Sequence, residues 1–248
     1  HMVQAISACP MTIAEILALA ERIEKDELPA DDVVDGLAGL AEPEPATSTA
    51  DSGDADEEGD GEDEEEDEAA SAAISAAMLA QLKSMALEKF AVIRKNHAKL
   101  LAHIEKGEYK SENYVKAQKK ISAEMMEIRF AAKIVEQLCD SVRGEVEKIR
   151  GHERKLQELM VHKCHMPRDH FIKLFPDKAM DLRWVDREIA AGKPYSDAFA
   201  KNRQALVERQ EALIELQKKV GIPITDFKDI YKHMSSGEAK SRKAKKEM

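Results

Sequence analysis

The chain has 248 residues, of which 4% are aromatic and 35% are charged, and Leu, Ile, Val, Met and Ala fill most of its apolar positions. Such a composition favours helices over strands, and no apolar run is long enough to span a membrane. The three cysteines, Cys9, Cys139 and Cys164, have no close spacing. They therefore argue against a disulfide framework and predict a reducing, cytoplasmic location.

The net charge of −10 is set by one segment. Residues 51–68 contain thirteen carboxylates and no basic residue, and without those thirteen negative charges the rest of the chain carries about +3. The sequence therefore predicts a mildly basic body with one acidic insert. Two interpretations of the insert remain open: a flexible linker, which charge blocks commonly form, or a nucleic-acid mimic that competes for a basic surface.

Residues 11–28 are predicted to form the first long helix, because apolar residues recur there at three- and four-residue spacing. A break at residues 29–32 contains Pro29 and two aspartates, and a short helix over residues 33–40 is predicted to follow it. Residues 42–70 then form a low-complexity tract. We predict that this tract is disordered, because it can bury too little apolar surface to offset its ordering entropy.

Two long helices are predicted next, over residues 71–106 and 112–163, each with a continuous apolar stripe. The short turn at Gly107 implies that they form an antiparallel pair. Gly144 and Gly151 are weak points at which the second helix could kink. No segment alternates between apolar and polar residues for long enough to predict a strand.

A third long helix is predicted over residues 196–220, ended by Gly221 and Pro223 and packed against the long pair. The pattern Ser-Ser-Gly-Glu at residues 235–238 is typical of a capping box and predicts the start of a last, basic helix. Shorter helices are predicted around residues 167–175, 181–190 and 225–231. The predicted fold class is all-α: a helical bundle built on long antiparallel helices, with a disordered acidic insert.

The cluster that looks most like a metal site consists of His162, Cys164, His165 and His170, with His152 one step back. Cysteine and imidazole are ligands for soft metals. Residues two apart do not share a helix face, however, and no second cysteine pair is present, which favours surface histidines beside a buried cysteine. Because phosphate loops, nucleophile elbows and His-Glu-x-x-His motifs are also missing, the sequence predicts a protein that is not an enzyme and needs no cofactor.

The end of the sequence is basic. Its cations could contact the phosphates of DNA, or they could form a solvated helix face with pairs such as Glu238–Arg242. The local sequence leaves both interpretations open. The candidate contacts for DNA phosphates are Lys240, Arg242, Lys243, Lys245 and Lys246.

Three stretches resemble bacterial primary sigma factors, the housekeeping, sigma-70-type subunits of RNA polymerase. Residues 233–248 (HMSSGEAKSRKAKKEM) closely resemble the segment that leads into the family's conserved region 2. Residues 164–175, with CHMP followed by FIKLF, are similar to its Cys-x-Met-Pro…Phe-Ile-x-Leu-Phe pattern, and residues 193–196 to its Lys-Pro-aromatic-Ser. Residues 3–40 resemble the stretch after region 1.2, and the acidic tract has the place of an acidic stretch in the family's non-conserved insert.

This resemblance implies a transcription initiation factor that binds core RNA polymerase and directs it to promoters. It also implies that the main polymerase-docking helix and the promoter-reading residues follow Met248, so that promoter DNA is a partner of the full-length protein only. The insert is expected to face the largest polymerase subunits, and the resemblance makes the five cations of residues 240–246 candidate polymerase contacts as well. The implied parts are 1–41 (helices following region 1.2), 42–70 (acidic linker), 71–234 (non-conserved helical subdomain) and 235–248 (start of the region 2 helix).

The chain is expected to be a monomeric piece of a longer protein, cut at both ends, with His1-Met2 as the remnant of an expression tag. Two other classes of function remain open. One is a helical scaffold or adaptor with an acidic segment, unrelated to transcription, which the residues after Met248 in the native gene would distinguish. The other is a metal- or redox-responsive sensor based on Cys164, which would bind zinc stoichiometrically.

Overall fold

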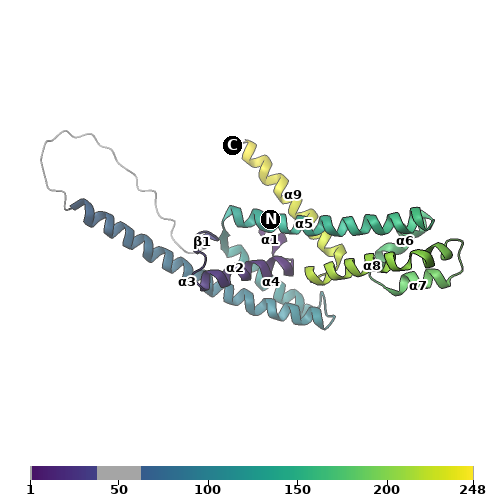
Figure 1. The fold of residues 1–248 in the computed structure, drawn as a ribbon. Coiled ribbons are helices and arrows are strands. Elements are labelled where there is room, and N and C mark those ends of the chain that lie inside the picture. Colours follow the sequence, from purple (N-terminus) through teal and green to yellow (C-terminus); the bar gives the residue numbers. More distant parts are fainter. Residues whose placement is uncertain (1, 38–62, 248) are drawn as a thin grey trace.

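The computed structural model describes residues 2–37 and 63–247, which are mainly helical (Figure 1). The prediction of an all-α protein is confirmed, with one small sheet added. In chain order the elements are α1 (Met2–Ile6), α2 (Pro10–Glu24), β1 (Val34–Leu37), α3 (Asp63–Glu105), α4 (Glu112–Glu127), β2 (Ile128–Phe130), α5 (Ala132–Gln157), the π-helix η1 (Glu158–Lys163), α6 (Arg168–Lys178), α7 (Arg183–Ala190), α8 (Ser196–Val220) and α9 (Ile224–Glu247).

The predicted acidic insert falls mainly outside the described residues. Residues 63–70 of that tract form the first turns of α3, whereas the prediction of disorder for residues 42–62 lies outside the part of the chain that the structure describes. In Figure 1 the first half of α3 extends away from the other helices. All side chains from Ala76 to Gln81 are exposed, so this part of the helix is in contact with solvent.

The predicted helix over residues 33–40 is wrong. Val34–Leu37 form β1, which pairs antiparallel with β2 through an irregular register. Val33 and Val34 are fully buried, and the Val33 carbonyl accepts a hydrogen bond from the Ala131 N–H at 2.9 Å. Burial and cross-strand pairing of these β-branched residues outweigh their weak helical spacing.

The same sheet interrupts the second long helix, which the sequence predicts over residues 112–163. That segment forms α4, β2, α5 and η1 instead. Ile128 and Phe130 are buried on either side of an exposed residue, a strand-like alternation too short to stand out within a helical stripe. Gly144 and Gly151 lie inside α5, so the helix does not end at either glycine, and a kink there stays a prediction.

The antiparallel pair predicted around Gly107 is formed by α3 and α4. Gly107 has a φ of +73°, a left-handed conformation that glycine adopts without strain and that commonly ends a helix. Ser111 caps α4, since its hydroxyl accepts a hydrogen bond from the Tyr114 N–H at 3.2 Å. The facing sides of the two helices are buried, as at Phe90 and Ile121.

From the centre of the molecule α5 extends to the far end, where α6, α7 and α8 lie (Figure 1). The helix predicted over residues 196–220 is confirmed as α8; it packs against α5 and α7 and ends at Gly221, whose φ is +81°. The buried side chain of Gln210 donates to the carbonyls of Ala179 and Asp181, each at 3.1 Å. These bonds fix the turn between α6 and α7.

The predicted break before the last helix is wrong. One continuous helix, α9, includes both the segment around residues 225–231 and the Ser-Ser-Gly-Glu sequence at residues 235–238. Phe227 and Met234 lie seven residues apart on the same face and are fully buried. Their burial holds both halves in one helical register and outweighs the capping preference of the serines.

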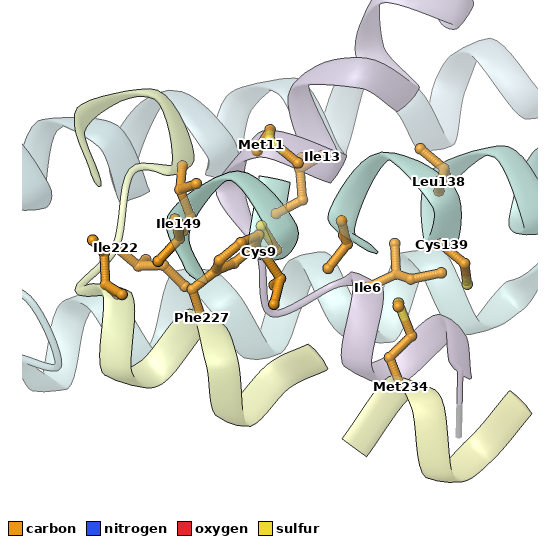
Figure 2. Packing of buried hydrophobic residues seen from close by; sticks show 14 of the residues in the cluster. Ile6, Cys9, Met11, Ile13, Leu138, Cys139, Ile149, Ile222, Phe227 and Met234 are labelled. Atoms are coloured by element: carbon orange, nitrogen blue, oxygen red, sulfur yellow. The ribbon is translucent and has the colours of Figure 1, made fainter. Parts of the chain in front are cut away.

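The core joins the two ends of the chain. Figure 2 shows side chains from α1, α2, α5 and α9 packed together, among them Ile6, Ile13, Ile149 and Phe227, which are at most 1% exposed. Leu138 is one of the residues of the apolar stripe predicted over residues 112–163, and it is buried in the same cluster. This core positions the last helix, whose end carries the candidate contact residues.

Candidate interaction surface

The candidate surface is the basic end of α9, and the first half of that helix positions it. Gly221 turns the chain out of α8, and the Phe227 N–H then donates to the Pro223 carbonyl at 3.0 Å in the first turn of α9. Figure 2 shows Met234 directed toward Ile6 of α1. Because α1 and α5 both pack on α9, the first half of the helix is held from two sides.

Polar contacts with α5 accompany this burial. The Glu153 carboxylate accepts hydrogen bonds from the Lys228 ammonium. One turn further along α9, the Arg150 guanidinium lies over the Tyr231 ring, 5.4 Å from its centre. This is within the range of a cation–π interaction. The two contacts fix the antiparallel alignment of α5 and α9.

An ion pair with two hydrogen bonds from one nitrogen follows at the next contact between these helices. The Arg143 guanidinium donates from Nη2 to both carboxylate oxygens of Glu238, at 2.8 and 2.9 Å, and from Nη1 to Asp140 of its own helix. The Glu238 carboxylate raises the pKa of Arg143 above its usual range. The structure thus pairs Glu238 with α5, and not with Arg242 of its own helix as the solvated-face interpretation assumed.

The predicted cations lie beyond this ion pair. Lys240, Arg242 and Lys243 are exposed, and Figure 1 shows this end of α9 directed away from the other helices. Lys245 and Lys246 are part of the same helix. The helix therefore presents a basic end that projects from a packed body. The role of these five cations in binding phosphate or polymerase stays a prediction.

Cys139 lies in the core near the Arg143–Glu238 ion pair, and its thiol has low reactivity. It is fully buried, close to Met234 in Figure 2. Burial, followed by the negative charge of Glu238, raises the pKa of the Cys139 thiol to about 11. Since the thiolate is the reactive form, this cysteine packs as a small apolar side chain.

The cysteine and histidines considered as a candidate metal site are not brought together. The Cys164 thiol is buried and contacts the Ala198 carbonyl at 3.6 Å, whereas His162 and His165 are exposed. His170 faces Lys193 on another segment, with 3.1 Å between Nε2 and Nζ. In residues 2–37 and 63–247 no group of three His, Cys, Asp or Glu side chains is placed to hold a metal ion.

A buried polar cluster that the sequence did not predict lies between α7 and α8. The Glu188 carboxylate accepts hydrogen bonds from the Lys193 ammonium at 2.9 Å and from the Tyr195 hydroxyl at 2.8 Å, and the Glu188 carbonyl accepts one from Ser196. Burial raises the pKa of Glu188, but the two hydrogen bonds outweigh it and the pKa is lowered. The cluster fixes the loop that contains Lys193-Pro194-Tyr195-Ser196.

A cavity of about 340 Å³ lies where the turn after α3 meets the turn after α8. Its lining is mainly apolar, and Lys218 is the one charged side chain in it. The lining residues are Ile104, Tyr109, Gln217, Lys218, Gly221, Ile222 and Pro223.

The fold and the surface define a helical module, in which a packed body holds a projecting basic helix. Residues 9–217 match the family described as sigma-70, non-essential region. The whole chain also aligns, with 40% identity over 258 positions, to the RNA polymerase sigma factor RpoD of Neisseria gonorrhoeae. The chain therefore belongs to the sigma-70 family, as the resemblance predicted.

The alignment covers 100% of this chain but 40% of that relative. The chain thus spans less than half the length of the protein it matches. The comparisons do not favour the scaffold interpretation. Among the described helices, none has both the length and the hydropathy needed to cross a membrane.

Proposed function

We propose that this chain acts in transcription initiation as part of a primary sigma factor, and that it binds core RNA polymerase in the cytoplasm. The main support is its alignment, over its whole length, with a protein named as an RNA polymerase sigma factor. We propose a binding role and not a catalytic one, because sigma factors act by binding and the chain belongs to that family.

In this proposal the body of helices faces the largest subunits of the polymerase and carries α9 in a fixed direction. The exposed cations Lys240 and Arg242 then supply attraction for polymerase or for DNA phosphates. The chain itself is a monomer, which size-exclusion chromatography with light scattering would show. The four-part division at residues 41, 70 and 234 belongs to the same proposal, although α9 passes residue 234 without a break.

Binding to core polymerase tests this function directly. A fluorescently labelled chain should bind core polymerase of Neisseria gonorrhoeae saturably, and an excess of unlabelled chain should displace it. Equal binding to an unrelated acidic protein of similar size, or no saturable binding, would count against the proposal. The scaffold interpretation predicts either of those two results.

We further propose that this chain alone does not prefer promoter DNA, because promoter reading requires side chains placed on base edges or on flipped bases. Exposed cations attract phosphates regardless of sequence and lose that attraction as salt rises. A gel-shift titration at two salt concentrations should give equal, salt-sensitive binding of promoter and scrambled duplexes. A clear preference for the promoter would contradict this proposal.

The contribution of α9 can be separated from the general charge of the body. Each phosphate contact adds about 0.9 to the slope of log affinity against log salt. Replacing both Lys240 and Arg242 by Ala should therefore lower the slope by about 1.8 if both contact phosphates. The matched control replaces Lys119 and Lys120, two exposed lysines of α4, and should leave the slope unchanged.

A further inference from the structure

The segment of α9 just before its basic end is intrinsically weak. Ser235, Ser236 and Gly237 follow one another inside the helix, and glycine lowers helix stability while serine hydroxyls compete for backbone hydrogen bonds. Adjacent Gly and Ser residues are common sites of helix kinks. Without a further restraint, the helix could bend here and its basic end could take several directions.

A restraint is present at the next residue. Glu238 is held by Arg143 of α5 through two hydrogen bonds of 2.8 and 2.9 Å, and Asp140 orients the same guanidinium from its other side. Two hydrogen bonds from one guanidinium nitrogen to the two carboxylate oxygens, together with the bond from the other nitrogen to Asp140, restrict the orientation of the two groups as well as their distance. Met234, one turn earlier, is fully buried. The weak segment therefore lies between two points that are both attached to the body.

Beyond Glu238 the described side chains of α9 are exposed, beginning with Ala239 and Lys240. The helix continues to Glu247, which places its end about 13 Å past the ion pair at 1.5 Å per residue. A bend of about 20° at the weak segment would move that end by about 5 Å. This is comparable with one helical turn, enough to bring the wrong side chain to a partner.

We propose that Arg143 is a positioning residue: by holding Glu238 it sets the direction in which the basic end of α9 leaves the body. The ion pair joins residues 95 positions apart, so it couples the body of helices to the segment that resembles the start of region 2. The consequence for polymerase binding rests on the function proposed above; the consequence for helix direction does not.

Distance measurements between two spin labels test the direction. Glu147 of α5 and Arg242, further along the projecting end of α9, are exposed and suit labelling after replacement by Cys, since Cys9, Cys139 and Cys164 are buried. The wild-type pair should give one narrow distance distribution. Arg143→Ala should broaden or shift it, Arg143→Lys should restore it only in part, and the exchange of both charges, Arg143→Glu with Glu238→Arg, should restore it largely.

The matched control is Lys148→Ala, which removes another exposed α5 side chain, one that pairs with Glu145 at 2.9 Å. It should leave the distribution narrow. The Arg143–Glu238 pair is half-buried and still in contact with water, and such pairs contribute about 1 kcal/mol or less, so Arg143→Ala should lower the melting temperature by less than about 3 °C. Unchanged distances in both Arg143→Ala and Glu238→Gln would overturn the inference, and so would a broadening that Lys148→Ala reproduces.

Binding to core polymerase separates this inference from the proposed function. We expect Arg143→Ala to bind several-fold more weakly than the wild type, and the charge exchange to recover most of the loss. If the wild-type chain does not bind polymerase, the proposed function fails while the distance measurements still decide the helix direction. If the wild type binds and Arg143→Ala binds equally well despite a broadened distribution, the link between helix direction and binding is overturned.

Discussion

The two halves of α9 have the same backbone structure but opposite surroundings. Up to Met234 the helix is fixed by buried apolar side chains, of which Phe227 and Met234 are fully buried. Beyond Glu238 the described side chains are exposed and mainly basic, as at Lys240 and Arg242. The first half therefore determines where the helix lies, and the second determines what it offers to a partner. Changes in the two halves should separate stability from binding.

The largest expected effect on stability comes from a substitution in α5, against which the first half of α9 packs. Leu138→Asp places a carboxylate in the core cluster that includes Ile6 and Met234. Burying an unpaired charge costs more than about 4 kcal/mol, which would remove much of the stability of a typical domain. Circular dichroism during urea unfolding should show a strongly lowered midpoint or an unfolded chain. Gln137→Asp, at the exposed neighbouring position, is the control and should unfold nearly as the wild type does.

Truncation of a buried side chain of α9 should have the next largest effect on stability. Phe227 is fully buried, and truncating a buried phenylalanine to alanine typically costs about 3–5 kcal/mol. Phe227→Ala should lower the free energy of unfolding by that amount in denaturant titrations, whereas His233→Ala, at an exposed position of the same helix, should change it little. A small loss for Phe227→Ala would mean that the first half of α9 is not fixed by burial.

The pH dependence of stability provides a smaller effect that comes from the body alone. Burial lowers the pKa of His97 and of His152 below the ordinary value of 6.5, with Arg209 and Lys155 adding to the effect at His152. Below that value the unfolded chain binds more protons than the folded one, so stability is fully present above about pH 6.5 and falls as the pH is lowered through it.

Unfolding free energies at about pH 7.5 and about pH 5.5 would measure this loss. His97→Gln should lose part of the difference, because glutamine cannot be protonated in this range. The exposed basic end of α9 should contribute nothing to it. A difference that is unchanged in His97→Gln would mean that other groups, such as His152, account for it.

The smallest effect on stability is expected in the second half of α9. Exposed substitutions away from special features usually change stability by less than about 0.5 kcal/mol. The double substitution of Lys240 and Arg242 by Ala should stay within that limit in the same denaturant titration. A loss of more than about 1 kcal/mol would show that this end contributes to folding, and the distinction between the two halves would fail.

The sequence predicted the helices whose signals are local. The third long helix was predicted with the observed bounds, because Gly221 and Pro223 end it without help from any other segment. The turn at Gly107 and the buried position of Leu138 were predicted in the same way. The helical spacing of apolar residues and the glycines that end helices are properties of a few neighbouring residues, and they can be recognised in one sequence.

The features that the sequence did not predict depend on residues far apart. The strand at Ile128–Phe130 exists because β1 pairs with it from near the start of the chain. The partner of Glu238 is Arg143, 95 residues away, where the local pattern suggested a cap or a bond to Arg242. In the candidate surface, the basic residues could be recognised from the sequence. The direction in which the end of α9 presents them depends on its contacts with α1 and α5.

The three native thiols make it possible to observe how this molecule opens. Cys9, Cys139 and Cys164 are all fully buried, and burial raises the pKa of Cys9 and of Cys139 to about 11. An alkylating reagent can therefore reach each sulfur only when the surrounding structure separates transiently. Cys9 lies at the junction of α1 and α2, Cys139 lies beside α9, and Cys164 follows η1 at the far end. Mass spectrometry of the wild-type protein at successive times of alkylation would show the order in which the three cysteines react. That order would rank the opening free energies of these regions, including the contact between α5 and α9 that sets the direction of the basic helix.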